Sequence, residues 1–323
     1  MITADIRENF VQSNNSKFKI IRLPYNQGHG NARRVGLDKC SYDYVALMDA
    51  DDISDADRFE KQIKCFEEDK ELSIVGGLLE EFIDNMDNVV GVRAVPIEDE
   101  DIKNFLKKRC PFNQVTVMFK KSDVALAGGY IDWYCEEDYY LWIRMYQKGM
   151  KFKNIAENLV SVRIGAEMYQ RRGGWRYFQS ETKLQAYMLK HRIIGLGRFI
   201  YNVGIRLVVQ VIMPNKFRGH LFKLTRKKAD AKYTTKETNV SSYHIINDKL
   251  IDQPLGKVSR IPFSVSMCVY KNDNPEHFDE ALKSIINQTL YPTEIVLVID
   301  GPIQDSIEAV ISKYRNILSV SSI

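Results

Sequence analysis

Cysteine is scarce in this sequence, with five residues among 323, at positions 40, 65, 110, 135 and 268, and none in CxxC spacing. This odd, scattered set excludes a disulfide framework and a cysteine-rich zinc site, and it favours reduced thiols in a cytosolic compartment. His29 and His191 each stand alone, without the spacing of metal ligands. We interpret both histidines as non-catalytic.

Long apolar runs are also absent. No stretch approaches the ~20 residues that span a bilayer, and Asp5, Arg7 and Glu8 stand where a signal peptide would be apolar. The GxGxxG pattern of a dinucleotide-binding dehydrogenase is missing as well. A formal net charge of +4 is too small to indicate nucleic-acid binding. These absences predict a cytoplasmic protein that binds no nucleic acid.

What is present is typical of a globular protein. Apolar residues make up 45% and charged residues 27% of the chain, which is long enough to bury one large core or two smaller ones. Hydrophobic periodicity predicts alternating strands and helices, and therefore an α/β fold. The expected strands are 18–22, 44–48, 73–75, 115–119 and 159–163, and the expected helices are 57–66, 100–107, 137–147 and 181–190.

A change in composition divides the chain. Residues 229–260 are rich in Lys, Thr, Asn, Ser and Asp with little apolar periodicity, which indicates a linker between a main part, 1–228, and a second unit, 261–323. The second unit is a predicted β-α-β-α segment whose first helix starts at Asn274-Pro275. Its other expected elements are strands 263–270 and 294–299 and a helix at 303–314.

The stretch YVALMDADD, residues 44–52, carries the strongest chemical signal. Its apolar run suits a strand buried on both faces of a parallel sheet, and its carboxylates follow where such a strand ends. An extended backbone would point Asp49 and Asp51 to the same side. Because like charges repel, a hard cation such as Mg²⁺ or Mn²⁺ is expected among Asp49, Asp51 and Asp52, together with substrate phosphates. The ordinary alternative is a solvated acidic loop that starts a helix.

Residues 190–228 combine many Lys and Arg with apolar residues and contain no Asp or Glu. Basic amphipathic segments of this kind often lie on anionic membrane surfaces. Helices packed on their own domain with a solvated basic face explain the pattern equally well. The sequence leaves open whether the protein associates peripherally with the inner face of the plasma membrane.

Several motifs together resemble a family 2 glycosyltransferase of the GT-A fold. The resemblance is to the bacterial enzymes of exopolysaccharide and O-antigen synthesis, the amylovoran type, and it covers roughly residues 1–228 and 261–323. It implies a mostly parallel central sheet flanked by helices, followed by a basic helical extension before the linker. The motifs are SVSMCVYKND with SIINQT, EIVLVIDG, NQGHGNARRVG, MDADD, and AGGY with CEEDYYLWIRM.

The last motif contains the expected catalytic residues. Asp138 precedes Leu141, Trp142 and Met145 at i+3, i+4 and i+7, so its carboxylate lies on the apolar stripe of a helix, where burial strengthens a carboxylate as a base. The ordinary alternative is a helix-dipole role. The resemblance implies that Asp138 deprotonates the acceptor hydroxyl and that Glu137 orients or binds the acceptor.

The donor side follows from the other motifs. Arg33 comes after the turn Gly28-His29-Gly30 at an expected helix start, which suits a nucleotide diphosphate. The resemblance implies that Tyr270 and Asp300 bind the nucleotide base, usually uracil. Arg163, with Arg171 and Arg172, either neutralises the leaving diphosphate or belongs to a solvated basic loop.

The implied function is an inverting, metal-dependent glycosyltransferase. Its donor would be a nucleotide sugar, most simply a UDP-sugar, and its cofactor Mg²⁺ or Mn²⁺. Its acceptor would be a saccharide or a lipid-linked sugar in surface polysaccharide biosynthesis.

One feature departs from the resemblance, because the unit that opens the family's fold stands here at 261–323. Either the chain is a circular permutant, or it joins most of one transferase to the start of a second. A helix expected at 4–11, which duplicates the one at 303–314, favours the second account.

Without strands 263–270 and 294–299, the strand at 44–48 would be an exposed apolar edge. We therefore expect the second unit to dock on it, within one chain or exchanged between the two chains of a dimer. The alternative function is a non-catalytic transferase remnant that binds nucleotide weakly or partners a complete enzyme. Close approach of Tyr270 and Asp300 to Asp51 and Arg33 would argue against that alternative.

Overall fold

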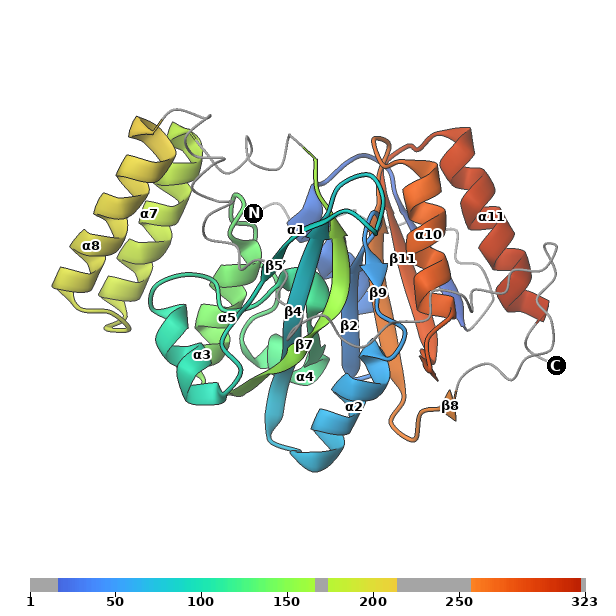
Figure 1. Ribbon diagram of the computed structural model, residues 1–323, viewed down its shortest axis with the longest axis horizontal. Coiled ribbons are helices and arrows are strands. Elements are labelled where there is room, and N and C mark those ends of the chain that lie inside the picture. Colours follow the sequence, from blue (N-terminus) through green and yellow to red (C-terminus); the bar gives the residue numbers. More distant parts are fainter. Residues whose placement is uncertain (1–16, 166–173, 214–256, 321–323) are drawn as a thin grey trace, which may run out of the picture.

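The computed structural model describes residues 17–165, 174–213 and 257–320, which form a mixed α/β fold around one central sheet (Figure 1). In spatial order its main path is β1 (Phe18–Leu23), β11 (Glu294–Asp300), β9 (Phe263–Val269), β2 (Tyr44–Asp49), β6 (Met118–Lys120), β4 (Leu72–Phe82), β7 (Lys151–Arg163) and β3 (Ile53–Ser54). Strand β5 (Val89–Arg93) pairs with β4 off this path. The contiguous strands β1, β11, β9 and β2 are parallel, whereas β6, β3 and β5 run antiparallel to their neighbours.

Helices cover both faces of the sheet. On one face α2 (Arg58–Glu68), α10 (Pro275–Ile286) and α11 (Asp305–Val320) share a core with the sheet through residues such as Phe59, Phe278 and Ile307. On the other face α1 (His29–Lys39), α3 (Asp99–Leu106), α4 (Lys121–Leu126), α5 (Glu137–Gln147) and α7 (Trp175–Lys190) form a second core. The helical layers explain why β11, with EIVLVID, is buried along its whole length.

Helix α8 (Leu196–Arg206) packs beside α7 at one end of the molecule, distal from α10 and α11 (Figure 1). A short π-helical turn, η2 (Leu207–Ile212), continues it. Within residues 17–165, 174–213 and 257–320, no helix is long and apolar enough to cross a membrane.

The second unit lies inside the sheet rather than at its edge. Strand β11 pairs with β1 from Phe18↔Ile295 to Leu23↔Asp300, and β9 pairs with β2 from Tyr44↔Phe263 to Asp49↔Cys268. Strands β9 and β11 therefore separate β1 from β2, although β1 and β2 are consecutive in sequence. The expected docking occurs within one chain, and it covers β1 as well as β2.

A buried ionic cluster at the amino edge of the sheet fixes this insertion. Glu294 of β11, 2% exposed, pairs with Lys19 of β1 at 2.7 Å and accepts a hydrogen bond from Ser264 Oγ of β9 at 2.7 Å. It also accepts the backbone N–H of Ser41, just before β2. Burial raises the pKa of Glu294, but Lys19, Ser41 and Ser264 outweigh burial and lower it. One carboxylate thus joins four neighbouring segments of the sheet.

Close packing of α1 depends on a glycine. A Cβ on Gly36 would lie 2.6 Å from Ser266 Oγ of β9 and 3.2 Å from Val298 Cγ2 of β11. Helix α1, which connects β1 to β2, therefore approaches the two inserted strands more closely than any side chain at this position would allow.

Several expected boundaries were wrong. Residues 114–116 form a 3-10 turn, η1 (Gln114–Thr116), so the strand expected at 115–119 is the short β6. Strands expected at 73–75 and 159–163 are the ends of the much longer β4 and β7. The linker expected up to residue 260 includes β8 (Lys257–Val258), which pairs with β10 (Leu290–Tyr291). The helix expected at 4–11, residues 214–256 and Arg171 and Arg172 lie outside the described residues.

A fragment that ends at Tyr243 should be poorly soluble and should not unfold cooperatively, because β1 and β2 lose the strands between them. Circular dichroism during urea titration measures this. Co-expression with a fragment of residues 255–323 should restore a cooperative transition. A soluble 1–243 fragment with a sharp transition of its own would contradict the prediction.

Gly36→Val should lower the free energy of unfolding by about 1–3 kcal/mol, because the new side chain overpacks the contact with β9 and β11. The matched control is Gly204→Val in α8, where a Cβ meets nothing within 4 Å. The control should change stability by no more than about 0.5 kcal/mol. Equal effects of the two substitutions would show that α1 does not pack this closely.

Candidate active site

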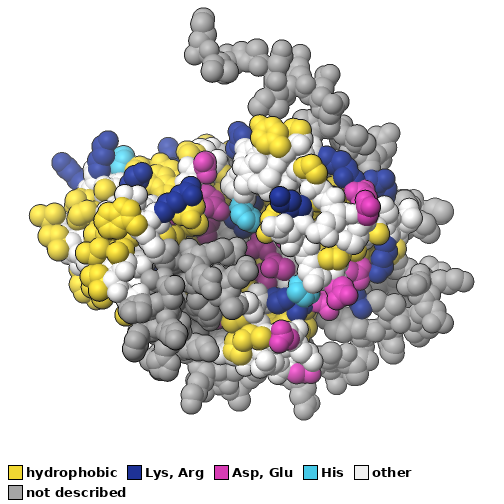
Figure 2. Space-filling view, turned by 90° about the horizontal axis from the view of Figure 1, so that it is seen from above, with side chains coloured by type: hydrophobic (Ala, Val, Ile, Leu, Met, Phe, Trp, Pro, Cys, Tyr) yellow, Lys and Arg dark blue, Asp and Glu magenta, His cyan; other side chains and the backbone are white. Residues whose placement is uncertain are grey.

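The carboxyl ends of the parallel strands bring the two sequence-distant parts of the chain to one edge of the sheet. Asp49 at the end of β2 is in register with Cys268 of β9, and Cys268 is in register with Val298 of β11, two residues before Asp300. Adjacent strands lie about 4.8 Å apart. Figure 2 looks onto this edge and shows acidic side chains gathered near its centre, with histidines beside them.

The charges of these groups act on one side chain, that of Cys268. Burial raises the pKa of Cys268 to about 12, with Arg33 opposing the rise and Asp49, Asp300 and Asp273 adding to it. The sequence singled out three of these four residues. Arg33 and Asp49 come before the 229–260 segment, and Asp300 comes after it. The structure therefore brings Asp300 and Arg33 together around the aspartate cluster, as the transferase hypothesis requires.

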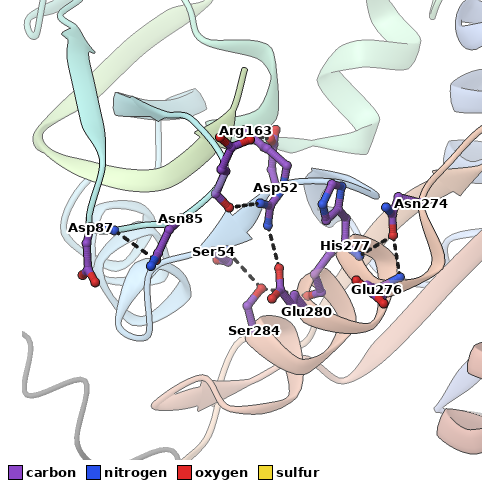
Figure 3. A network of polar contacts seen from close by, with 12 residues as sticks. Asp52, Ser54, Asn85, Asp87, Arg163, Asn274, Glu276, His277, Glu280 and Ser284 are labelled. Carbon is purple, nitrogen blue, oxygen red and sulfur yellow. Dashed lines mark hydrogen bonds and ion pairs between the residues drawn. The ribbon is translucent and has the colours of Figure 1, made fainter. Parts of the chain in front are cut away.

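The three aspartates of MDADD occupy different environments. Strand β2 ends at Asp49, and Ala50 and Asp51 form a turn, so the simple alternation expected from an extended backbone does not continue to Asp51. The Asp49 side chain is 44% exposed, and Asp51 is exposed. Asp52 is only 4% exposed and accepts the backbone N–H of Arg163 at 3.0 Å (Figure 3). Burial and the charges of Asp51 and Asp49 raise the pKa of Asp52 well above its usual range.

A fourth carboxylate, Asp273, was missed in the sequence. It follows β9 and accepts the backbone N–H of Tyr270 through Oδ2 at 2.9 Å. Burial raises its pKa to about 7, the Tyr270 N–H opposes the rise, and the charges of Asp51 and Asp49 add to it. One sequence signal could have identified Asp273. It stands three residues after the strand predicted at 263–270, which was expected to dock on the strand that leads to Asp49.

This set of carboxylates fits a hard divalent cation only in part. Asp49, Asp51, Asp52 and Asp273 act on one another's ionisation and offer oxygen donors, as Mg²⁺ and Mn²⁺ prefer. In the part of the chain that the structure describes, no three His, Cys, Asp or Glu side chains are arranged to hold a metal by themselves. Asp49 and Asp51 could therefore hold a cation jointly with substrate phosphates, whereas the buried Asp52 is better suited to fixing the loop.

Arg33 links the aspartates to helix α5. Its guanidinium contacts Asp49 Oδ1 at 3.2 Å and Glu137 Oε1 at 3.0 Å, and its side chain is 15% exposed. Burial lowers the pKa of Arg33, but the two carboxylates outweigh burial and raise it, so the guanidinium stays charged. Helix α1 begins at His29 after Gly28, whose φ of 84° is left-handed, and this turn presents Arg33 one helical turn later.

Asp300 and Tyr270 border the same helix start. Asp300 is 5% exposed, and its two carboxylate oxygens accept the backbone N–H groups of Gln27 at 2.7 Å and Gly28 at 3.1 Å. Tyr270 packs edge to face against His29, with ring centroids 6.1 Å apart. The predicted base-binding residues thus lie on either side of the Gly28-His29-Gly30 turn.

The side chain of Arg163 is engaged by the inserted unit. Its guanidinium pairs with Glu280 of α10 at 2.6 Å (Figure 3). It also donates to the carbonyl of Asp84 at 2.9 Å and lies over the Phe82 ring. The backbone N–H of Arg163 donates to Asp52, and the backbone hydrogen bond and the Arg163 charge both lower the pKa of Asp52 against the effect of burial. In this arrangement Arg163 braces β7 against the inserted unit, and a contact with diphosphate would require its release from Glu280.

The catalytic-motif carboxylates begin helix α5. Asp138 is half-buried, and its Oδ1 accepts the N–H of Tyr139 at 2.6 Å. The carboxylate buried most deeply is instead Glu136, 5% exposed at the N-cap, whose pKa is raised by burial and by the charges of Glu181 and Asp138. Burial was expected for Asp138, but the deeply buried carboxylate is that of Glu136. Glu136 is the N-cap of α5, which begins at Glu137.

Tyr130 was also missed. It is 4% exposed and accepts a hydrogen bond at its hydroxyl from Gln114 Nε2 at 3.0 Å. Burial raises its pKa, Arg33 and the Gln114 hydrogen bond oppose the rise, and Asp138 and Glu137 add to it. Its hydroxyl therefore lies among the charges of Arg33, Glu137 and Asp138, at the end of the Gly128-Gly129 turn.

A buried cation lies beneath the aspartates. Arg58 of α2 is 0% exposed and donates to the carbonyl of Leu47 at 2.8 Å and to Gln62 Oε1 at 3.1 Å. Burial lowers its pKa to about 9, with Asp49 and Asp52 opposing the fall. An arginine at a helix start gives no sequence signal of burial, so this residue was not anticipated.

Comparison with known proteins gives consistent results. The family described as glycosyl transferase family 2 matches residues 2–123. A glycosyltransferase of Haemophilus influenzae is 39% identical over 211 residues, covering 64% of this chain and 78% of that protein. The amylovoran biosynthesis glycosyltransferase AmsE of Erwinia amylovora is 35% identical over 208 residues, covering 64% and 77%.

A third relative has a named reaction. It is the UDP-Gal:alpha-D-GlcNAc-diphosphoundecaprenol beta-1,3-galactosyltransferase of Escherichia coli, 35% identical over 205 residues, which cover 64% of this chain and 74% of that protein. Similarity at this level over most of each relative, together with the α/β fold and the shared edge of the sheet, establishes that this chain belongs to the family 2 glycosyltransferases, enzymes of the GT-A fold.

Proposed function

We propose that the protein transfers a sugar with inversion from a UDP-sugar to a saccharide or lipid-linked acceptor in surface polysaccharide biosynthesis, with the help of Mg²⁺ or Mn²⁺. The observation that carries the proposal is that Asp49 of β2 and Asp300 of β11 lie at the carboxyl edge on either side of β9, where Arg33 pairs with Asp49 at 3.2 Å. This arrangement supports a single donor site shared by the main part and the inserted unit. The displaced position of residues 261–323 in the sequence suggested a non-catalytic remnant. That reason is weaker now, because β9 and β11 lie within the sheet.

On the donor side, Asp49 and Asp51 would hold the cation against the diphosphate. When bound, the cation would neutralise the negative charge that develops on the leaving diphosphate. The positive end of α1 and Arg33 would add to that stabilisation, since both face this edge. Asp52 would keep the loop in place through Arg163 N–H, and Asp273 would complete the acidic rim.

The nucleoside would lie against Tyr270 and Asp300. The Tyr270 ring offers a stacking surface for uracil. Asp300 accepts hydrogen bonds from Gln27 and Gly28, so it would both shape the turn that receives the diphosphate and present a carboxylate to the base.

On the acceptor side, Asp138 would act as the general base. Its carboxylate would take the proton of the acceptor hydroxyl while that oxygen forms a bond to C1 of the sugar. The bond between C1 and the diphosphate oxygen breaks, and its electron pair leaves with UDP, so the anomeric configuration inverts. Glu137, fixed by Arg33, and Tyr130 would orient the acceptor on this side.

The acceptor is proposed by analogy with the relative from Escherichia coli, whose name includes a diphosphoundecaprenol-linked sugar. A lipid-linked acceptor would require the enzyme to work at the inner face of the plasma membrane, with peripheral association through residues 190–228.

Asp138→Asn should lower kcat by about 10²–10⁴-fold while UDP binding changes little, because the amide cannot accept the acceptor proton. UDP release in the presence of acceptor measures the rate, and calorimetry measures binding. The matched control is Asp101→Asn in the first turn of α3, which removes a similar helix-dipole contribution. Retention of full activity by Asp138→Asn would contradict the assignment of the base.

UDP should raise the melting temperature more in the presence of Mn²⁺ than in its absence, because the cation relieves repulsion between the carboxylates and the diphosphate. Asp51→Asn should weaken the Mn²⁺-dependent part of UDP binding by about tenfold or more. Asp87→Asn, the same change in the β4–β5 turn, should leave it unchanged. A panel of UDP-, GDP- and dTDP-sugars with Mn²⁺ that gives neither heat nor a thermal shift on folded protein would refute the proposed function.

A further inference from the structure

Helix α8 and the turn η2 show an inverted pattern of burial. The buried residue of α8 is Asn202, 3% exposed, and that of η2 is Gln210, 7% exposed. Their large apolar side chains face outward and are between 38% and 65% exposed: Leu196, Ile200, Ile205, Val208, Val211 and Ile212, with Tyr201 beside them. A helix on the surface of a soluble protein would bury its apolar side chains against the core and expose its polar ones to water. The outer surface formed by these seven residues is called the α8 face below.

Polar contacts on the inner side hold this orientation. Asn202 Nδ2 donates to the carbonyl of Lys107 at 3.0 Å and to Gln185 Oε1 at 2.8 Å. Arg206 pairs with Glu181 of α7 at 2.9 Å and donates to the carbonyl of Lys108 at 2.9 Å. Rotating α8 to bury its apolar side would leave these groups without partners, which is costly. The α8 face is therefore a fixed feature of the surface.

The charge around the α8 face has one sign. Between residues 190 and 213 the chain contains no Asp or Glu, and Lys190, Arg192 and Arg198 flank the apolar residues. Figure 2 shows hydrophobic side chains clustered at the α7–α8 end of the molecule, with basic side chains along one border. An apolar cluster of this kind marks an interaction site, and the basic border complements an anionic surface.

We propose that the α8 face docks on the surface of an anionic lipid bilayer, with Leu196, Ile200 and Ile212 inserted among the acyl chains and Arg198 at the level of the headgroups. An inverted amphipathic helix beside a basic border matches the interfacial mode of membrane binding. No described helix spans a bilayer, so the contact lies in the membrane plane. This inference deepens the proposed function. It rests on that function for the idea that the acceptor is linked to a lipid.

The α7–α8 pair also connects this surface to the acceptor side. Gly174 N–H, at the start of α7, donates to the carbonyl of Gln210 in η2 at 3.0 Å. Ser180 of α7 donates through Oγ to the carbonyl of Tyr134 at 2.6 Å, and the indole N–H of Trp133 donates to the carbonyl of Ser180 at 3.3 Å. Residues 133 and 134 lie in the loop that leads into α5, which begins at Glu137. Docking would therefore fix the height of α5 above the lipid surface.

The test is flotation of the full-length protein with vesicles of equal parts phosphatidylglycerol and phosphatidylcholine, and with vesicles of phosphatidylcholine alone. The protein should float with the anionic vesicles, more weakly at high salt and with phosphatidylcholine alone. The triple variant Leu196→Gln, Ile200→Gln and Ile212→Gln should lose more than about tenfold of its partitioning, because each apolar side chain contributes to insertion. The matched control is Leu126→Gln with Met86→Gln, which changes exposed apolar residues elsewhere and should float like the parent.

The triple variant alters exposed positions, so its melting temperature should equal that of the parent, which confirms that it folds. Absence of flotation by the parent, or equal flotation of parent and triple variant, would overturn the inference. So would size-exclusion chromatography that shows a dimer of the parent and a monomer of the triple variant without vesicle binding, since a second copy would then occupy the face. Flotation needs neither donor nor acceptor, so a parent that floats but transfers no sugar would overturn the proposed function and leave this inference standing.

Discussion

The parallel ladder from β1 through β11 and β9 to β2 is the interaction on which the rest of the structure depends. Two strands from the end of the sequence separate two strands that are consecutive near its start. The ladder that β1 forms with β11 and the one that β2 forms with β9 therefore join residues more than 200 positions apart in the sequence. The apolar side chains of β9 and β11 complete both cores. The Glu294 cluster at the amino edge and the close packing of Gly36 fix this arrangement, so the opposite edge acquires a single geometry.

That opposite edge concentrates negative charge at the ends of β2, β9 and β11. Four aspartates, Asp49, Asp51, Asp52 and Asp273, influence one another, and burial makes ionisation of Asp52 and Asp273 costly. Arg163 offsets part of this cost at Asp52, and the backbone N–H of Tyr270 offsets part of it at Asp273. Arg33 and Arg58 add positive charge near Asp49.

Arg33 also joins the two halves of the proposed reaction. The contact with Asp49 belongs to the donor side, and the contact with Glu137 belongs to the helix that carries Asp138. A movement of the diphosphate region would therefore be transmitted to the acceptor carboxylates through one guanidinium. On the other side of α5, Glu136 and the loop before it contact α7, so the helix that carries the proposed base is held from both directions.

The sequence by itself determined the class of fold and the family resemblance, and it singled out Asp49, Arg33 and Asp300, which the structure places at one edge of the sheet. Apolar runs that end in aspartates, as at 44–52 and 294–300, are typical of buried parallel strands with polar groups at their carboxyl edge. The Asn274-Pro275 helix start was equally local, and the Asn274 side chain caps α10 by accepting the N–H groups of Glu276 and His277. These features follow from short-range patterns, which a sequence expresses directly.

Only the tertiary structure decided how those residues meet. Which strands pair with β9 and β11, whether Arg163 faces the aspartates or Glu280, and which of Glu136 and Asp138 is buried all depend on contacts between distant segments. Asp273 and Tyr130 stand at the ends of the motifs SVSMCVYKND and AGGY, but only the neighbouring strands and helices brought them to the site, and no local pattern marked the buried Arg58. The inverted surface of α8 likewise became visible only once its polar side was found packed inward, since hydrophobic periodicity gives the spacing of a helical face but not the direction in which that face points.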